Sequence, residues 1–213
     1  MNNFIKILKS ISLFSLSGFL PQISNFLLLP ITTKFLRTED FSIYGIILAY
    51  NLLLQGIKGI GLDFLFVNSY FKQRADWKIY WSKLLGLRLC WKHFFFILQF
   101  LFLYVVLDES KVPEKITVIL FLALNDYLFS PSNDAANRYY VLSKKSKLFF
   151  IMTSASVFAS FISNYFLIVK FGFGWLGWII SSFLFSLVSF LFNAKILYID
   201  LKILPSLKFD RNF

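Results

Sequence analysis

The chain has 213 residues, of which 58% are hydrophobic and 21% aromatic, and its mean hydropathy is +0.69. Only 15% of the residues are charged, whereas a soluble domain has about 25%. The 22 lysines and arginines outnumber the 11 acidic residues and give a formal net charge of +11. These values argue against a soluble enzyme, a disordered tail or a collagen-like fibre, and indicate a membrane or membrane-surface protein.

Six charge-poor stretches predict about six transmembrane helices. Each has the roughly 20 apolar residues that cross the hydrocarbon core as a helix. In chain order they cover residues 10–33, 41–66, 84–107, 116–137, 148–169 and 171–194. We therefore predict an all-α polytopic membrane protein whose residues 1–213 form a single six-span lobe. A signal peptide is the alternative for the first stretch, because Lys6 and Lys9 precede it, but it contains no small-residue cleavage site.

The basic residues indicate how the predicted spans are oriented. With the N-terminus inside, the inner segments hold 14 lysines and arginines and the outer segments hold five. Cytoplasmic loops carry such an excess, so we expect both termini to be cytoplasmic. The outer segments include the acidic pair Glu39–Asp40 and the acids Asp108, Glu109 and Glu114. Topology and anionic lipid explain the positive charge better than a nucleic-acid partner does.

Cysteine and histidine content limits the possible chemistry. Cys90 is the only cysteine and His93 the only histidine in the sequence. An intramolecular disulfide and a His/Cys metal cluster are therefore excluded. We expect no metal site, no cofactor and no enzyme activity.

Ionisable residues inside the predicted spans are the strongest functional signal, because each costs at least about 2.5 kcal/mol to insert. Asp126 lies about 15 Å into the fourth span, near the bilayer midplane. It needs a partner or water, or it is protonated and hydrogen-bonded. Lys58 lies in a glycine-rich polar patch of the second span, and its side chain either snorkels or meets a specific partner. Asp63 diverges from Lys58 by about 140° around a helix, so we expect the two to face different neighbours.

Arg88 and Lys92 are four residues apart near the start of the third span and share one face of a helix. They are either ordinary charges at the inner interface or a contact for an anionic lipid headgroup. Pro21 and Pro131 lie inside the first and fourth spans, where proline produces kinks. Small polar residues recur at helical spacing and predict close helix packing or a hydrated path. They are Ser10, Ser17, Ser24, Ser156, Ser160, Ser163, Ser182, Ser186, Ser189 and Asn193.

Several glycine, proline and aromatic patterns resemble a known family. They comprise Ser17-Gly18 with Pro30, residues 36–45 (LRTEDFSIYG), residues 59–62 (GIGL), the basic segment 136–147, and residues 164–168 followed by 171–177. Together they resemble the polysaccharide (O-antigen type) flippases of the multidrug/oligosaccharidyl-lipid/polysaccharide exporter superfamily. The resemblance covers nearly the whole chain and corresponds to the N-terminal six-helix half of such a flippase.

The resemblance implies a transporter in the inner (cytoplasmic) membrane that flips undecaprenyl-diphosphate-linked oligosaccharide to the outer leaflet. It also implies a cationic cavity for the diphosphate sugar. We place Lys58, Arg88 and Arg138 near that substrate path, and Asp63 and Asp126 as candidates for proton or ion coupling.

Members of this family typically have twelve or more spans in two lobes, whereas six are predicted here. A homodimer or a second six-helix chain would complete the two-lobed cavity, and a truncated or split flippase is the competing explanation. Two other functions stay open. One is a membrane glycosyltransferase that uses polyprenyl-phosphate sugars, with Glu39–Asp40 in its first outer loop. The other is a non-transporting membrane subunit.

Overall fold

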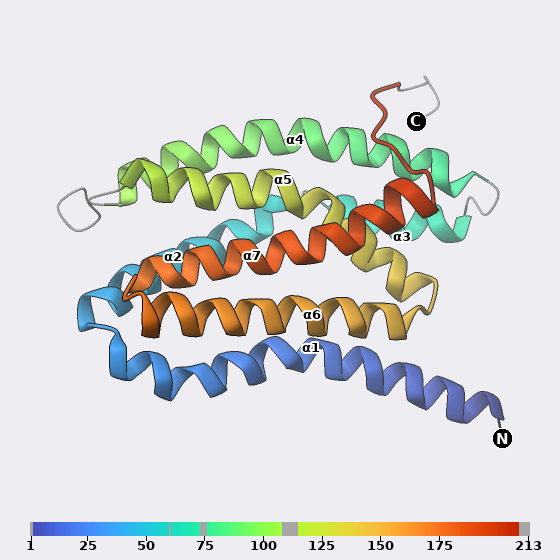
Figure 1. Cartoon of the computed structure of the whole chain (residues 1–213). Coiled ribbons are helices and arrows are strands. Elements are labelled where there is room, and N and C mark those ends of the chain that lie inside the picture. Colours follow the sequence, from blue (N-terminus) through green and yellow to red (C-terminus); the bar gives the residue numbers. More distant parts are fainter. Residues whose placement is uncertain (1, 60, 73–75, 108–114, 209–213) are drawn as a thin grey trace. The chain divides into compact units, whose positions relative to one another are not determined.

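A computed structural model describes residues 2–59, 61–72, 76–107 and 115–208, and these residues form helices joined by short connections (Figure 1). Several loop charges used to predict the orientation, among them Arg74, Lys111 and Arg211, lie outside these residues. The α-helices are α1 (Asn2–Phe35), α2 (Thr38–Lys58), α3 (Leu62–Lys72), α4 (Trp77–Val106), α5 (Lys115–Leu142), α6 (Ser146–Asn164) and α7 (Trp175–Ala194). Two π-helical segments, η1 (Tyr165–Lys170) and η2 (Lys195–Asp200), continue α6 and α7. The described part of the chain has no strand, so the all-α prediction is confirmed there.

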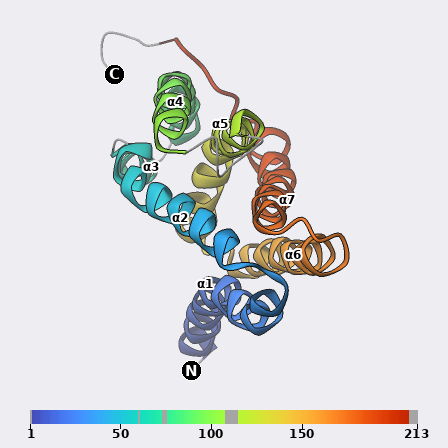
Figure 2. The same cartoon turned by 90° about the vertical axis from the view of Figure 1, so that its left-hand side faces the viewer.

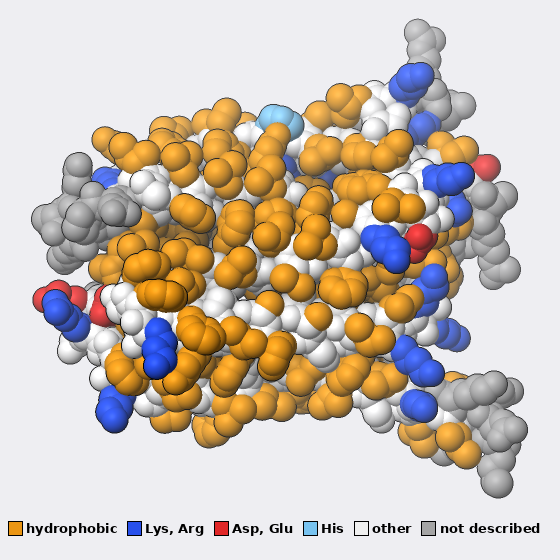
Figure 3. Space-filling model, viewed as in Figure 1, with side chains coloured by type: hydrophobic (Ala, Val, Ile, Leu, Met, Phe, Trp, Pro, Cys, Tyr) orange, Lys and Arg blue, Asp and Glu red, His pale blue; other side chains and the backbone are white. Residues whose placement is uncertain are grey.

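Four helical stretches are long and apolar enough to cross a membrane. They are Ile7–Phe35, Trp77–Val106, Ser146–Lys170 and Trp175–Asp200. Large apolar side chains are exposed on many helices; Val105 is 82% and Phe26 is 74% exposed. Figure 3 shows hydrophobic side chains along the visible helices and lysine and arginine side chains towards their ends. This surface is typical of a protein embedded in lipid. The predicted crossings at 41–66 and 116–137 are not among the four and stay predictions.

The second predicted span is divided between two helices. α2 ends at Lys58 and α3 begins at Leu62. Gly61 has a φ of +72°, a left-handed conformation that glycine adopts without strain, and the Leu62 N–H donates a hydrogen bond to the Gly59 carbonyl oxygen at 2.9 Å. A single continuous helix over 41–66 is therefore wrong, because the glycines end α2 rather than only bending it.

Contacts between residues divide the protein into two compact units, with boundaries inside α2, at the end of α5 and inside α7. Unit 1 comprises residues 1–49 and 143–189, and unit 2 comprises residues 50–142 and 190–213. The prediction of a single six-span lobe stays untested by this division, and each unit is described by itself below.

In unit 1, α1 lies along α6, and small polar residues form part of the packing. Ser17 and Ser156 are 1% and 0% exposed, and the Ser189 hydroxyl donates to the Ser156 hydroxyl at 2.8 Å. Gly177 lies so close to η1 that a Cβ atom there would be 2.7 Å from Ile168 Cγ1. The close-packing interpretation of the serine pattern is therefore confirmed at Ser17, Ser156 and Ser189.

In unit 2, α3, α4 and α5 pack against one another, as the view in Figure 2 shows. α5 contains Pro131 and bends along its length (Figure 1). One face of α4 is buried at intervals of three or four residues, the spacing of a helix that packs on one side. Its residues include Trp81, Leu85, Arg88, Lys92, Phe95, Gln99 and Leu103. This face therefore places two cations inside unit 2.

The chain after η2, residues 201–208, has no regular secondary structure and contacts α4 at Ser82 and Gly86; we call it the strap. The Ser206 N–H donates to the Ser82 carbonyl oxygen at 2.9 Å, and Ile203 is fully buried. Gly86 faces the Ser206 carbonyl so closely that a Cβ atom would overlap it. The strap therefore requires glycine at this position of α4.

Candidate functional site

Seven charged side chains from α2, α3, α4 and α5 form a cluster inside unit 2. We call this set the ion-pair cluster. Its cations are Lys58, Arg88, Lys92 and Arg138, and its carboxylates are Asp63, Asp126 and Asp134. With four cations and three carboxylates, the cluster has a formal excess of one positive charge when all of them are ionised.

Asp126 joins two lysines in one part of the cluster. Its Oδ2 atom is 2.6 Å from Lys58 Nζ, and its Oδ1 atom is 3.6 Å from Lys92 Nζ. The Lys92 side chain is only 2% exposed and the Asp126 side chain 14%. Lys92 lies near the midpoint of α4 (Trp77–Val106). Lys58 lies at the end of α2, and its ammonium also donates to the Asn51 amide oxygen at 3.3 Å.

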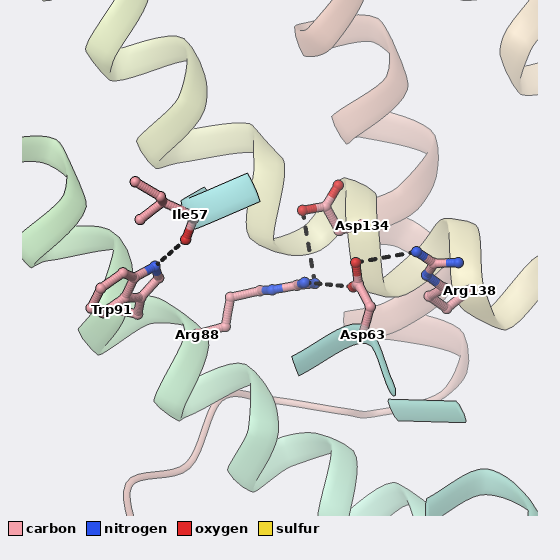
Figure 4. A network of polar contacts seen from close by, with 6 residues as sticks. All are labelled: Ile57, Asp63, Arg88, Trp91, Asp134 and Arg138. Carbon is pink, nitrogen blue, oxygen red and sulfur yellow. Dashed lines mark hydrogen bonds and ion pairs between the residues drawn. The ribbon is translucent and has the colours of Figure 1, made fainter. Parts of the chain in front are cut away.

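Asp63 joins two arginines in the other part of the cluster (Figure 4). Arg88 Nη2 donates to Asp63 Oδ1 at 2.6 Å, and Arg138 Nη2 donates to Asp63 Oδ2 at 3.1 Å. Asp134 Oδ2 is 3.8 Å from Arg88 Nη1. The Arg88 side chain is 1% exposed, whereas those of Asp63 and Arg138 are 38% and 48% exposed. Arg88 is therefore enclosed, while its partner Asp63 reaches the surface of unit 2.

The break between α2 and α3 places these groups. Because α2 ends at Lys58, the carbonyl of Ile57 has no helical partner; the Trp91 indole N–H donates to it at 3.2 Å (Figure 4). Asp63 then falls in the first turn of α3 and faces α4 and α5. Without the break, Asp63 would follow the α2 helix and meet a different neighbour.

Arg88 has hydrogen-bonding capacity that the cluster does not use. Its Nε and Nη1 atoms are buried and make no hydrogen bond to the residues that the structure describes. Its guanidinium lies over the Phe66 ring, with its central carbon 5.3 Å from the ring centroid. Buried donors without partners are costly, and a guanidinium can hold a carboxylate or phosphate through two parallel hydrogen bonds. The arrangement can therefore accept a further anionic group.

The predicted site residues come together in this cluster. Lys58, Arg88, Arg138, Asp63 and Asp126, which are scattered between positions 58 and 138, all belong to it. Lys58 and Asp63 contact different partners, as predicted, but the reason is the break between α2 and α3 and not their divergence around one helix. Their roles in transport stay predictions.

Two features of the cluster were not predicted from the sequence. The burial of Arg88 and Lys92 was not expected: their side chains are 1% and 2% exposed inside unit 2, while the interfacial and headgroup interpretations stay predictions. The signal was their spacing from Trp81 and Phe95, which places all four on one helical face. Asp134 was missed because it lies near the predicted end of the fourth span, where an acidic residue is unremarkable. Its position four residues before Arg138 was the available signal.

The acidic pair that motivated the glycosyltransferase alternative lies in unit 1. Asp40 Oδ2 accepts a hydrogen bond from the Arg37 N–H at 2.8 Å, and Asp40 Oδ1 accepts one from the Trp175 N–H at 3.3 Å. The carboxylate thus links the α1–α2 corner to the start of α7, and Glu39 is exposed. Both interactions satisfy backbone donors at helix starts, which gives Asp40 a structural role.

Within the described ranges, no group of three or more His, Cys, Asp or Glu side chains is placed to hold a metal ion. In comparisons with protein-family models, curated proteins and solved structures, nothing matches this chain. The resemblance to polysaccharide flippases therefore stays a prediction from the sequence, and the chain is best characterised as an all-α, membrane-embedded protein with a partly buried ion-pair cluster.

Proposed function

We propose that this protein is a membrane transporter that flips a lipid-linked oligosaccharide across the cytoplasmic membrane during polysaccharide biosynthesis. The proposal includes six membrane crossings with both termini in the cytoplasm, and a second six-helix lobe supplied by another copy or another chain. Four apolar helices long enough to span a membrane and the distribution of basic residues support it.

The ion-pair cluster is the observation that carries the proposal. Burying Arg88 and Lys92 on an apolar helix is costly, and a fold that needed only stability could place hydrophobic residues there. The excess positive charge suits a diphosphate, which is the anionic part of a lipid-linked oligosaccharide. So do the Nε and Nη1 donors of Arg88, which make no hydrogen bond to the described residues. Asp63 and Asp126 could each take up a proton and release a cation to the substrate.

The test is a flipping assay with the purified chain in phospholipid vesicles. A fluorescent sugar linked to polyprenyl diphosphate is incorporated in both leaflets, and its loss of fluorescence to an impermeant quencher reports exchange between them. We expect the wild-type chain to expose the inner-leaflet substrate at least tenfold faster than protein-free vesicles do. Equal rates would reject transport by this chain alone or as a homodimer.

Arg88 variants connect the assay to the cluster. Arg88→Gln removes the guanidinium, and Arg88→Lys keeps the charge but loses the two-pronged donor geometry. We expect both to slow flipping at least fivefold, and we expect Arg88→Lys to stay folded because a cation still faces Asp63. The matched control is Lys147→Gln, which removes one exposed positive charge from α6 outside the cluster. Wild-type rates in folded Arg88→Lys and Arg88→Gln proteins would exclude the cluster from the substrate path.

A further inference from the structure

Unit 1 contains a pocket that the ion-pair cluster does not explain. Its volume is about 250 Å³, and α1, α2, α6 and α7 line it. None of the described residues that line it is charged. The lining side chains that matter here are Ser24, Asn25, Tyr44, Asn164, Trp178 and Ser182. The pocket thus combines hydroxyl and amide groups with aromatic rings.

Asn164, which lines the pocket, has a buried amide oxygen, Oδ1, without a hydrogen-bond partner among the described residues. Its side chain is only 5% exposed. Its Nδ2 group makes only a long contact of 3.5 Å to the Ser160 hydroxyl. An amide oxygen left unpaired in this way costs about 1–3 kcal/mol. A ligand hydroxyl that donates to Oδ1 would remove that cost.

The helical hydrogen-bond pattern changes immediately after Asn164. Asn164 is the last residue of α6, and the chain changes there to the π-helical segment η1. π-helical turns are rare within α-helices and occur frequently at functional sites, because they reposition the side chains next to them. This change coincides with the residue that carries the unpaired oxygen.

Two aromatic rings give the pocket an apolar wall. Trp178 and Tyr44 lie with their ring centroids 4.0 Å apart and their planes inclined by 30°. A pyranose ring has C–H groups on its faces and hydroxyls around its edge, so it matches an aromatic wall bordered by hydroxyl and amide groups. The volume lies just below the roughly 300–1,000 Å³ of pockets for drug-sized ligands, which suits one sugar ring. The uncharged lining would leave a carboxylate or phosphate without a counterion.

We propose that this pocket binds one neutral sugar ring, with Asn164 Oδ1 accepting a hydroxyl hydrogen bond and Trp178 contacting a C–H face. As the glycan-recognition site of the transporter, it rests on the proposed function. Sugar binding by the pocket does not require transport and is measured separately.

The test is ligand-observed saturation-transfer NMR on the full chain in lipid nanodiscs free of glycoside detergents. The probes are the methyl glycosides of glucose, galactose, rhamnose and N-acetylglucosamine, with methyl glucuronide as the charged comparator. We expect at least one neutral glycoside to bind at least tenfold more tightly than the glucuronide. Sodium chloride is titrated in parallel, because oxygen-rich pockets can also take a cation.

Pocket variants locate the binding. Asn164→Leu should weaken the binding of the preferred glycoside at least tenfold, and Trp178→Leu at least fivefold. Asn68→Leu, a matched substitution on α3 in unit 2, should leave it unchanged. The thermal unfolding midpoint of each variant checks its fold, and Ser182→Ala, expected to weaken binding twofold or more, replaces any variant that fails this check.

The inference is overturned if no neutral glycoside binds better than the glucuronide, if folded Asn164→Leu and Trp178→Leu proteins bind normally, or if only sodium binds. Its failure differs from failure of the proposed function. Normal flipping without glycoside binding rejects the pocket alone, whereas glycoside binding without flipping rejects transport by this chain alone or as a homodimer and retains the pocket.

Discussion

Neutralising Asp126 is the sharpest test of the ion-pair cluster. In Asp126→Asn, Lys92 loses its carboxylate partner, and the described residues provide it with no other ion pair within 4 Å. Because its side chain is only 2% exposed, Lys92 cannot recover hydration without a local rearrangement. Removing one partner of a buried ion pair typically costs about 3–5 kcal/mol, and we expect a loss in this range.

Lys58 should contribute little to that loss although it is nearer to Asp126. Its side chain is 24% exposed, it also contacts Asn51, and its long stem can move the ammonium towards water. The destabilisation therefore comes mainly from Lys92. Lys92→Met removes this cation while Asp126 keeps Lys58 at 2.6 Å, so we expect Lys92→Met to cost about 1 kcal/mol.

A double-mutant cycle measures this difference. Asp126→Asn, Lys92→Met and the double variant are unfolded reversibly in mixed micelles while tryptophan fluorescence is followed. The substitution Asp126→Asn should cost about 2 kcal/mol less in the Lys92→Met background than in the wild type. A cost below about 1 kcal/mol in the wild type, or the same cost in both backgrounds, would refute the argument that Asp126 compensates a buried Lys92.

Two further substitutions test contacts outside the cluster. Gly86→Ala places a methyl group against the Ser206 carbonyl, so we expect a loss of about 1–3 kcal/mol and faster tryptic cleavage at Lys202. Gly18→Ala meets no atom within 4 Å inside α1, so it should not lower stability or speed this cleavage. Equal cleavage of both variants would show that the strap does not need Gly86. Asp40→Ala removes the acceptor for two backbone N–H groups and should lower the unfolding free energy by about 0.5–2 kcal/mol. Glu39→Ala changes the exposed neighbouring residue and should not lower it. Unchanged stability of Asp40→Ala would contradict the structural role of Asp40.

Most helices could be predicted from the sequence, but the residues at which they begin and end could not. The predicted span at 84–107 lies almost wholly within α4, which begins seven residues earlier at Trp77. Hydropathy marks the part of a helix that lies in hydrocarbon, whereas backbone hydrogen bonding continues into the polar flanks. The glycines at 59 and 61 were visible in the sequence as well. The sequence did not show that these glycines end α2, because the end of the helix also depends on the hydrogen bond from the Trp91 indole and on the arginines that bind Asp63.

For the candidate site, some charged residues could be predicted from the sequence, but their partners could not. Lys58, Asp63 and Asp126 were recognisable as ionisable residues within apolar stretches, because the cost of a charge in hydrocarbon depends on local composition alone. Their partners were not recognisable, since Lys58 and Asp126 lie far apart in the chain and any of several helices could have carried the opposing charge. The position of Arg88 and Lys92 inside unit 2 likewise depended on which face of α4 meets α3 and α5.

Composition and charge-poor segments were sufficient to predict a membrane protein built of helices. Long charge-poor segments are stable in lipid only when their backbone groups bond within the segment, so composition alone predicts membrane helices. Only the folded structure showed which charges form ion pairs and where the second predicted span divides. It also showed that Asn164 has a buried oxygen without a hydrogen-bond partner at the end of α6. These features depend on the directions of side chains from helices distant in the chain, and periodicity along one helix does not specify its neighbour.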